Sequence, residues 1–449
     1  MLFPLKLTAF EEYMFFDDCP DYPMTGVFRL RFSGKLNVDA MNAAIQTTVE
    51  RHPLLRSTVQ KDAKPGYCWN IAESSSIQLE RWTADSTNEY PVASYMDLTK
   101  HVGTRFWLVD NSDSHDLVSQ IHHACTDALG ICLLVDDLLM AYAKNVGAIE
   151  CDVPLRPLNN QRLPLRNHFG LTWKKTLQLI PLQILGMHVV AKFFLRNAVP
   201  LRSPDVNSES DLPVVFPSSS TLRFDTDTTL KILAAAKRIQ VTVNDLLTRD
   251  LFLAIDAWRT QNGVQSKNEW LRFFVPINHR VAEDATLSAA NVMSAVFLER
   301  QSSQLHDPES LLRSLQLQMQ RVKRYQLGFL FIAAHALMSR IPQLRACVIR
   351  QKKCVSSCVF SNVGVVFNQM ALLRQDGKLK IGDVLLEDVD FVAPLRPMTA
   401  AAFCVCTYAG RLSINLHFDP RAISKSQAKS LLNSLDSKIR QSLKTQHKE

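Results

Sequence analysis

The stretch that decides the fold is His122-His123-Ala124-Cys125-Thr126-Asp127, which places two histidines and a carboxylate beside a predicted strand-to-helix turn. Residues 115–123 carry the apolar content of a strand, and residues 129–142 carry apolar side chains at helical spacing. A histidine that ends a strand can be held rigidly while its ring faces a cleft. Since its unperturbed pKa is about 6.5, it can take a proton from a hydroxyl or amine at neutral pH. We therefore predict an acid–base site here, with the aspartate fixing the turn through an ion pair.

This motif resembles the His-His-x-x-x-Asp-Gly signature of the condensation-domain and chloramphenicol-acetyltransferase-like acyltransferase superfamily, and the chain is similar to its free-standing alcohol acyltransferase and wax ester synthase-type members. Further segments resemble motifs of the superfamily in the order that it uses: residues 51–56 (RHPLLR), 243–247 (VNDLL), 275–280 (VPINHR), 291–294 (NVMS), 360–364 (FSNVG) and 407–419 (TYAGRLSINLHFD). The resemblance therefore covers nearly the whole chain.

The resemblance implies an α/β fold of two similar subdomains, each with a mixed sheet and helices, around a central tunnel. Donor thioester and acceptor would enter this tunnel from opposite faces. Residues 1–153 would form the N-terminal subdomain, residues 154–220 a proline-rich basic crossover, and residues 221–449 the C-terminal subdomain. The chain is long enough for two such hydrophobic cores.

The same resemblance assigns roles to individual residues. His123 is the catalytic histidine, His122 supports the turn and Asp127 is the structural acid. Arg280, at the arginine of the 275–280 segment, is the candidate ion-pair partner of Asp127. Ser361 and Asn362 are the candidate donor-binding residues, which would shape the opening between the subdomains or donate to the acyl oxygen. The alternative role for both residues, which we favour, is a structural turn.

The implied reaction moves an acyl group from an acyl-CoA thioester to a hydroxyl or amine. A neutral His123 would accept the proton of the attacking group and return it to the leaving thiolate, so that no permanently bound cofactor and no metal is needed. One alternative is a stand-alone condensation domain that takes its acyl group from the phosphopantetheine of a carrier protein. Another is a catalytically silent binding or scaffold protein. A thiol-nucleophile role for Cys125 is a further, less favoured hypothesis.

Two features depart from the superfamily pattern. Ala128 stands where the motif has glycine, and Gly130 follows two positions later. The added methyl group is expected to narrow the tunnel near the donor without removing the base. The tryptophan-containing DFGWG motif of the plant acyltransferases is missing from the chain, which argues against that branch.

The net charge of +8 is concentrated in the crossover. No acidic residue lies between Asp152 and Asp205, whereas eight basic residues do: Arg156, Arg162, Arg166, Lys174, Lys175, Lys192, Arg196 and Arg202. Such an excess suits a phosphate-bearing donor or an anionic membrane surface. No recognition motif accompanies it, which disfavours a nucleic-acid partner.

Within this interval, residues 176–191 are uncharged and apolar but shorter than the roughly 20 residues that span a bilayer. We expect either a helix packed between domains or an interfacial helix of 174–196 in peripheral contact with a membrane. The ten cysteines lack zinc spacing, and we expect buried thiols in a cytoplasmic protein.

The hydrophobic periodicity also predicts individual elements. Strands are expected at 28–32, 115–123, 358–360, 401–407 and 412–418, and helices at 38–51, 129–142, 229–238, 245–258, 311–325 and 424–443. Pro53 should end the helix at 38–51, because proline cannot continue a helix. Asn244 is the expected N-cap of the helix at 245–258.

Overall fold

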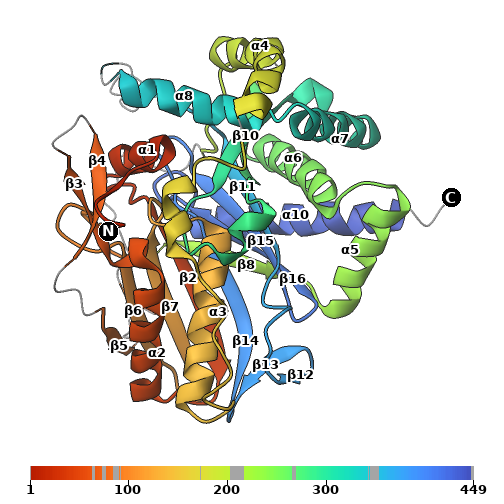
Figure 1. Cartoon of the computed structure of the whole chain (residues 1–449). Coiled ribbons are helices and arrows are strands. Elements are labelled where there is room, and N and C mark those ends of the chain that lie inside the picture. The colour runs from red at the N-terminus through yellow and green to blue at the C-terminus, as the bar shows by residue number, and fades with distance from the viewer. Residues whose placement is uncertain are drawn as a thin grey trace.

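The computed structural model describes residues 2–445 except 63–65, 73–76, 84–89, 92, 172, 203–216, 265–268, 342 and 344–352. Two large mixed sheets, each covered by helices, lie side by side in an α/β arrangement (Figure 1). The expected fold class is confirmed.

The first sheet has seven strands in the order β12-β13-β14-β2-β7-β6-β5. Its strands are β2 (Thr25–Ser33), β5 (Leu79–Thr83), β6 (Thr104–Asp110), β7 (Ser114–His122), β12 (Arg374–Gln375), β13 (Lys378–Ile381) and β14 (Val384–Val392). Helices α2 (Val38–Arg51) and α3 (Ala128–Asn145) pack together on this sheet (Figure 1). The prediction for α2 is confirmed at both ends, and the 3-10 helix η1 (Pro53–Arg56) follows it directly.

The second sheet has six strands in the order β10-β9-β11-β15-β16-β8. Its strands are β8 (Ser219–Arg223), β9 (Trp270–Asn278), β10 (Met293–Gln301), β11 (Cys358–Val365), β15 (Ala401–Tyr408) and β16 (Arg411–Phe418). Helices α5 (Thr226–Arg238), α6 (Val243–Gln261), α7 (Pro308–Arg324) and α10 (Lys425–Thr445) accompany this sheet.

The remaining described elements lie around these two layers. A small sheet joins β1 (Leu5–Lys6), β4 (Tyr67–Ile71) and β3 (Ser57–Lys61). The other helices are α1 (Ala9–Asp17), η2 (Asn160–Leu165), α4 (Trp173–Leu195), η3 (Ala282–Thr286), η4 (Ser302–Gln304) and α8 (Gly328–Arg340). Within the described part of the chain, no single helix is long and apolar enough to cross a membrane; the segments Leu177–Ile184 and Gly186–Leu195 of α4 reach that length together but are bent by 42°.

Strand β14 carries residues from the C-terminal part of the chain into the N-terminal sheet. It pairs antiparallel with β2, with Phe391 opposite Phe28. Strand β15 lies between the two cores, because Cys404 and Cys406 join the first core while Phe403 on the opposite face joins the second. The two halves are therefore tied through shared strands, which the sequence did not predict.

The expected N-cap of α6 was wrong by two residues. Thr242 caps the helix instead, since its hydroxyl accepts from the backbone N–H of Asp245 at 3.1 Å and the Asp245 carboxylate accepts from the Thr242 N–H at 3.1 Å. This reciprocal capping box satisfies two backbone donors. Asn244 lies inside the helix.

Candidate active site

Backbone hydrogen bonds fix His123 at the end of β7. Its N–H donates to the Met24 carbonyl at 2.7 Å. Its own carbonyl accepts from the Asn291 side-chain amide at 2.8 Å, and the same amide also donates to the Ala124 carbonyl at 2.8 Å. Asn291 comes from the segment that precedes β10, so the turn after β7 is held from both halves of the molecule.

The tautomer of His123 follows from the contact between its ring and the backbone of Thr126. Nδ1 lies 3.0 Å from the carbonyl oxygen of Thr126. Because a carbonyl oxygen only accepts, Nδ1 carries the proton and Nε2 is left with its lone pair. Burial lowers the pKa of His123 below 6.5, so the ring is neutral at physiological pH. The ring lines a large cavity, where a neutral Nε2 can accept a proton.

Asp127 begins α3 and connects the two halves of the protein. One carboxylate oxygen accepts from the backbone N–H of Gly130 at 2.9 Å, which caps the helix, and the other accepts from the Val292 N–H at 2.9 Å. Arg280, just after β9, donates from Nη1 and Nη2 to both oxygens at 2.9 Å each. Asp127 is buried, and the paired geometry is the bidentate form that Arg–carboxylate pairs favour. The structure thus contains the expected Asp127–Arg280 ion pair, and both carboxylate oxygens of Asp127 are engaged by protein donors.

His122 does not line the cavity, and its ring contacts the turn instead. Its side chain is fully buried, Nδ1 accepts from the Ala124 N–H at 3.1 Å, and Nε2 lies 3.2 Å from the Asp18 carboxylate. These contacts hold the chain around His123. Asp18 had not been singled out in the sequence, because nothing in its local pattern indicates a partner more than 100 residues away.

The other residues of the motif have packing roles. The Cys125 thiol is buried so tightly that a Cβ on Gly103 would lie 2.4 Å from its sulfur, and burial raises its pKa. Gly130 is equally constrained, since an added Cβ would lie 1.9 Å from the Thr126 hydroxyl. Ala128 lines the cavity. A thiol this protonated and enclosed is a poor nucleophile.

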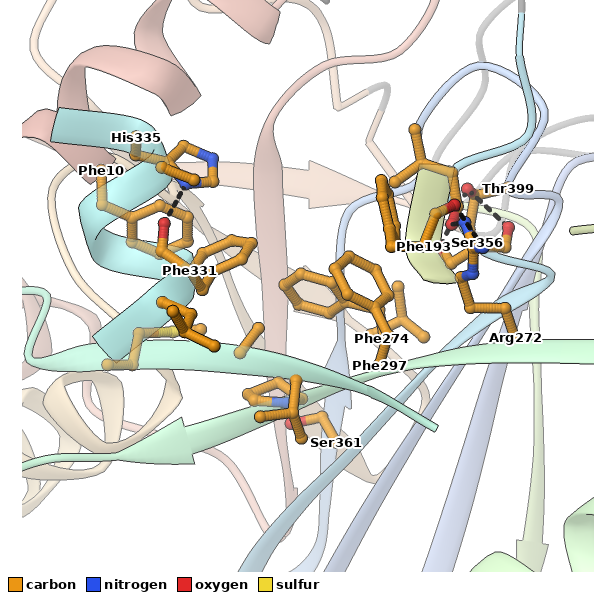
Figure 2. A pocket seen from close by; sticks show the side chains of 18 of the residues that line it. Phe10, Phe193, Arg272, Phe274, Phe297, Phe331, His335, Ser356, Ser361 and Thr399 are labelled. Carbon is orange, nitrogen blue, oxygen red and sulfur yellow. Dashed lines mark hydrogen bonds between the residues drawn. The ribbon is translucent and has the colours of Figure 1, made fainter. Parts of the chain in front are cut away.

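The cavity beside His123 has a volume of about 1260 Å³ and lies between α1, α4, α8 and strands of the second sheet. Figure 2 shows a row of aromatic rings that line the cavity. The rings form a continuous row in the order Phe10, Phe331, Phe274, Phe297 and Phe193, with centroids 5.2, 5.8, 5.7 and 4.7 Å apart. This apolar space exceeds the roughly 300–1,000 Å³ of common small-molecule sites.

One end of the cavity is strongly cationic. The buried Arg272 guanidinium lies 4.1 Å from the Phe193 ring and, like Arg196, pairs with Glu299. Arg300 is also buried, and desolvation lowers its pKa to about 10. Among the described lining residues Glu299 is the one acid, whereas the lining cations are Lys192, Arg196, Arg272, Arg300, Arg321, Lys353 and Arg396.

The two candidate donor-binding residues lie in different settings on β11. Ser361 lines the cavity (Figure 2), whereas Asn362 is exposed and its side-chain oxygen accepts from the Gly364 N–H at 2.9 Å. A β-bulge lies between Asn362 and Gly364. Donor binding by either residue stays a prediction. Within the described residues, no group of three or more His, Cys, Asp or Glu side chains could hold a metal ion.

Comparisons with known proteins find a family match and similar folds. The family model of the condensation domain matches residues 16–150, which include His122, His123 and Asp127. The crystal structure of the epimerization domain from the third module of tyrocidine synthetase B superposes with a TM-score of 0.68 over 98% of this chain and 96% of that one, at 14% identity. The chain thus carries a condensation-domain match over residues 16–150 and shares the fold of this solved epimerization domain over nearly its whole length.

Two further proteins are similar to the chain. The trichothecene 15-O-acetyltransferase TRI3 of Fusarium sporotrichioides superposes with a TM-score of 0.68 at 12% identity, over 98% of this chain and 94% of that one. A hybrid PKS-NRPS synthetase, pvhA of Talaromyces variabilis, is 27% identical over 143 residues, which is 29% of this chain but only 3% of the synthetase. The chain therefore matches a small part of that relative.

Besides Asp18, two residues of the candidate site were missed as functional residues. Asn291 was matched to a motif but given no role, and its contact with the turn only emerges once the segment before β10 is placed against β7. Thr126 supplies a backbone carbonyl, which any residue type would provide. Sequence patterns carry no signal for such a contact.

Proposed function

We propose that the protein is an acyltransferase that moves an acyl group from an acyl-CoA thioester to a hydroxyl or amine, with His123 as the general base. The observation that carries this proposal is a neutral histidine that lines a large cavity and whose Nδ1 proton is committed to a backbone carbonyl. Nε2 takes the proton of the acceptor as the acceptor attacks the thioester carbonyl. The same nitrogen then returns the proton to the departing thiolate, and no covalent enzyme intermediate is needed.

The other residues of the site act through His123. Asp127, paired with Arg280, keeps the start of α3 in place, and Asn291 holds the carbonyl of His123 and the carbonyl of the next residue, Ala124. This set limits the movement of the imidazole, which matters because small misplacements of a base are costly in rate. We assign all three as positioning residues. Ser361 lines the same cavity and is the candidate donor to the acyl oxygen.

The charge of the cavity supports a phosphate-bearing donor. Lys192, Arg321 and Lys353 are exposed at its cationic end, and none of them forms an ion pair with another residue that the structure describes. Coenzyme A carries several phosphate charges, whereas a phosphopantetheine arm carries one phosphodiester. Several cations that line one cavity fit the former better.

A carrier-dependent condensation reaction is the second candidate, favoured by the condensation-domain match and by the pvhA relative. Both candidates are tested by incubating the protein with a panel of acyl-CoAs, with the matching acyl-pantetheines, and with an acylated carrier protein, each with a cell extract as the acceptor source. Mass spectrometry then identifies new esters or amides, with His123→Ala as the blank. Products from acyl-CoA support the proposal. Products from the carrier alone support the second candidate, and the absence of all products favours a catalytically silent homologue.

A further inference from the structure

Helix α4 presents an apolar stripe to the outside of the molecule. The stripe repeats at helical spacing and runs from the first to the last residue of the helix. Its members are Trp173, Leu177, Ile180, Ile184, Met187, Ala191 and Leu195. All seven are exposed, with Trp173 at 68%, Ile184 at 67% and Leu195 at 81%. A helix on the surface of a globular protein normally turns its apolar stripe inward and its polar face to water. In α4 an apolar stripe faces outward instead.

The opposite face of α4 explains how the helix is held. Gly186 lies close to Leu330 of α8, so that an added Cβ would be 2.8 Å from a Leu330 methyl group. The Gln183 side chain donates to the carbonyl of Tyr325 at 3.3 Å. The helix thus has a packed inner face, and its outer stripe is an additional feature that packing does not require. Pro181 lies inside the helix near the 42° bend.

The stripe adjoins an opening of the cavity. Four apolar side chains both line the cavity and are more than half exposed: Met187 and Phe194 of α4, Leu317 of α7 and Leu337 of α8. These three helices lie together at one side of the molecule (Figure 1). The rim of the cavity is therefore apolar where it meets the outer face of α4, and a lipophilic chain could pass between the two without entering water.

Charge complementarity identifies the occupant of this surface. Lys174 and Lys192 are exposed near the two ends of the stripe, and the sequence has no acidic residue between Asp152 and Asp205. A protein partner normally presents both positive and negative side chains, and its positive side chains would find no acidic residue in this interval. A partner surface of uniformly negative charge fits this interval better. Anionic phospholipid headgroups above an apolar layer provide that combination.

We infer that α4 docks the protein onto an anionic membrane surface, with the apolar stripe in the lipid and the cavity rim facing the bilayer, so that a lipophilic acceptor or acyl chain enters the cavity directly from the membrane. The substrate part of this inference rests on the proposed acyltransferase function. The docking part does not, because it is measured without catalysis.

The test is flotation of the full chain with vesicles of phosphatidylcholine and phosphatidylglycerol in a two-to-one ratio, and with phosphatidylcholine alone. The variant Leu177→Ser/Ile184→Ser/Leu195→Ser removes three stripe side chains that do not line the cavity. We expect it to weaken binding to the anionic vesicles by about tenfold or more. The matched control is Leu230→Ser/Leu233→Ser/Leu373→Ser, which removes three exposed leucines elsewhere and should bind like wild type. Higher salt should also weaken wild-type binding.

A second measurement stands even if the triple variant folds poorly. Brominated phosphatidylcholine in the anionic vesicles should quench the fluorescence of Trp173, taken as the difference between wild type and Trp173→Phe. Wild-type protein that fails to float with anionic vesicles, or a Trp173 signal that the brominated lipid leaves unchanged, would overturn the inference. Self-association on gel filtration that the stripe variant abolishes, without vesicle binding, would overturn it in favour of a second copy as the occupant.

The two claims fail separately. Vesicle binding by a protein that consumes no thioester would leave α4 as a membrane-docking helix and remove the acyltransferase. Turnover of a soluble short-chain acyl-CoA by a protein that binds no vesicle would do the reverse. In the acyltransferase, the stripe variant should keep its turnover of the short-chain acyl-CoA and lose at least half of its activity on vesicle-embedded substrate.

Discussion

The Asp127–Arg280 pair allows the sharpest prediction of stability. Asp127 accepts four hydrogen bonds from donors on three segments of the chain: the Gly130 and Val292 N–H groups and two nitrogens of Arg280. In Asp127→Asn, one acceptor oxygen remains and the new amide group faces a donor. The Arg280 side chain is only 12% exposed and would lose its counter-charge. Removing one partner of a buried ion pair costs about 3–5 kcal/mol.

That cost converts to a shift in melting temperature. Unfolding entropy of about 2.1 cal/mol/K per residue gives a slope of about 0.9 kcal/mol/K for a chain of this length, so Tm should fall by about 3–5 °C. The control is Asp436→Asn, which breaks the exposed pair between Asp436 and Arg440 within α10 and should leave Tm nearly unchanged. Differential scanning calorimetry measures both variants. If Asp127→Asn melts like Asp436→Asn while activity is abolished, Asp127 acts in the chemistry and the positioning role is refuted.

Four further outcomes follow from the site. Since burial lowers the pKa of His123 below 6.5, kcat/KM for the acyl donor should fall only as the pH drops through a value below 6.5, and a midpoint above 7 would contradict the neutral-base assignment. Burial lowers the pKa values of His279, His335 and His417 from 6.5 to about 4, so folding stability should be complete above about pH 6.5 and decrease in urea titrations as the pH falls toward 4. Cys125→Ala should keep most of the activity in an acyl-CoA assay, because the thiol is protonated and does not line the cavity; loss of activity with an unchanged circular dichroism spectrum would revive the nucleophile. Arg321→Gln should raise KM for acyl-CoA several-fold and leave acyl-pantetheine kinetics unchanged, whereas equal effects on both donors would place the phosphates elsewhere.

Local signals in the sequence predicted much of the fold. Helix α2 begins and ends as expected, because Pro53 cannot continue it and its apolar residues repeat with helical period. The strand at 115–123 and the helix at 129–142 are also present, as β7 and α3, with ends that differ by one to three residues. Such elements are set by their own residues.

Elements that depend on distant partners were not predicted. Strand β14 enters the first sheet because it pairs with β2, more than 350 residues earlier, and no local pattern specifies a partner at that distance. The cap of α6 was misplaced because both Thr242 and Asn244 are cap-forming types, and the carboxylate of Asp245 completes the box with Thr242 alone. The division into residues 1–153, 154–220 and 221–449 stays a prediction.

The candidate site shows the same limit. His123, Asp127 and Arg280 were expected in one site because they stand at the matching positions of two family motifs. The structure brings them together around the turn after β7. The fixed tautomer could not be predicted, since it depends on a backbone carbonyl. The surplus of cations at one cavity end could not be predicted either, since Arg272, Arg300 and Arg321 come from different elements with no shared pattern. Catalytic roles for these residues stay predictions.

The central claim is that His123 is the general base, and the rate of acyl-CoA consumption by His123→Ala tests it most directly. The matched control is His306→Ala, an exposed histidine that does not line the cavity. The account predicts a loss of about 100-fold or more in kcat for His123→Ala, the usual contribution of a general base, with Tm close to wild type and with His306→Ala fully active. Turnover by His123→Ala within a few-fold of the control would contradict it.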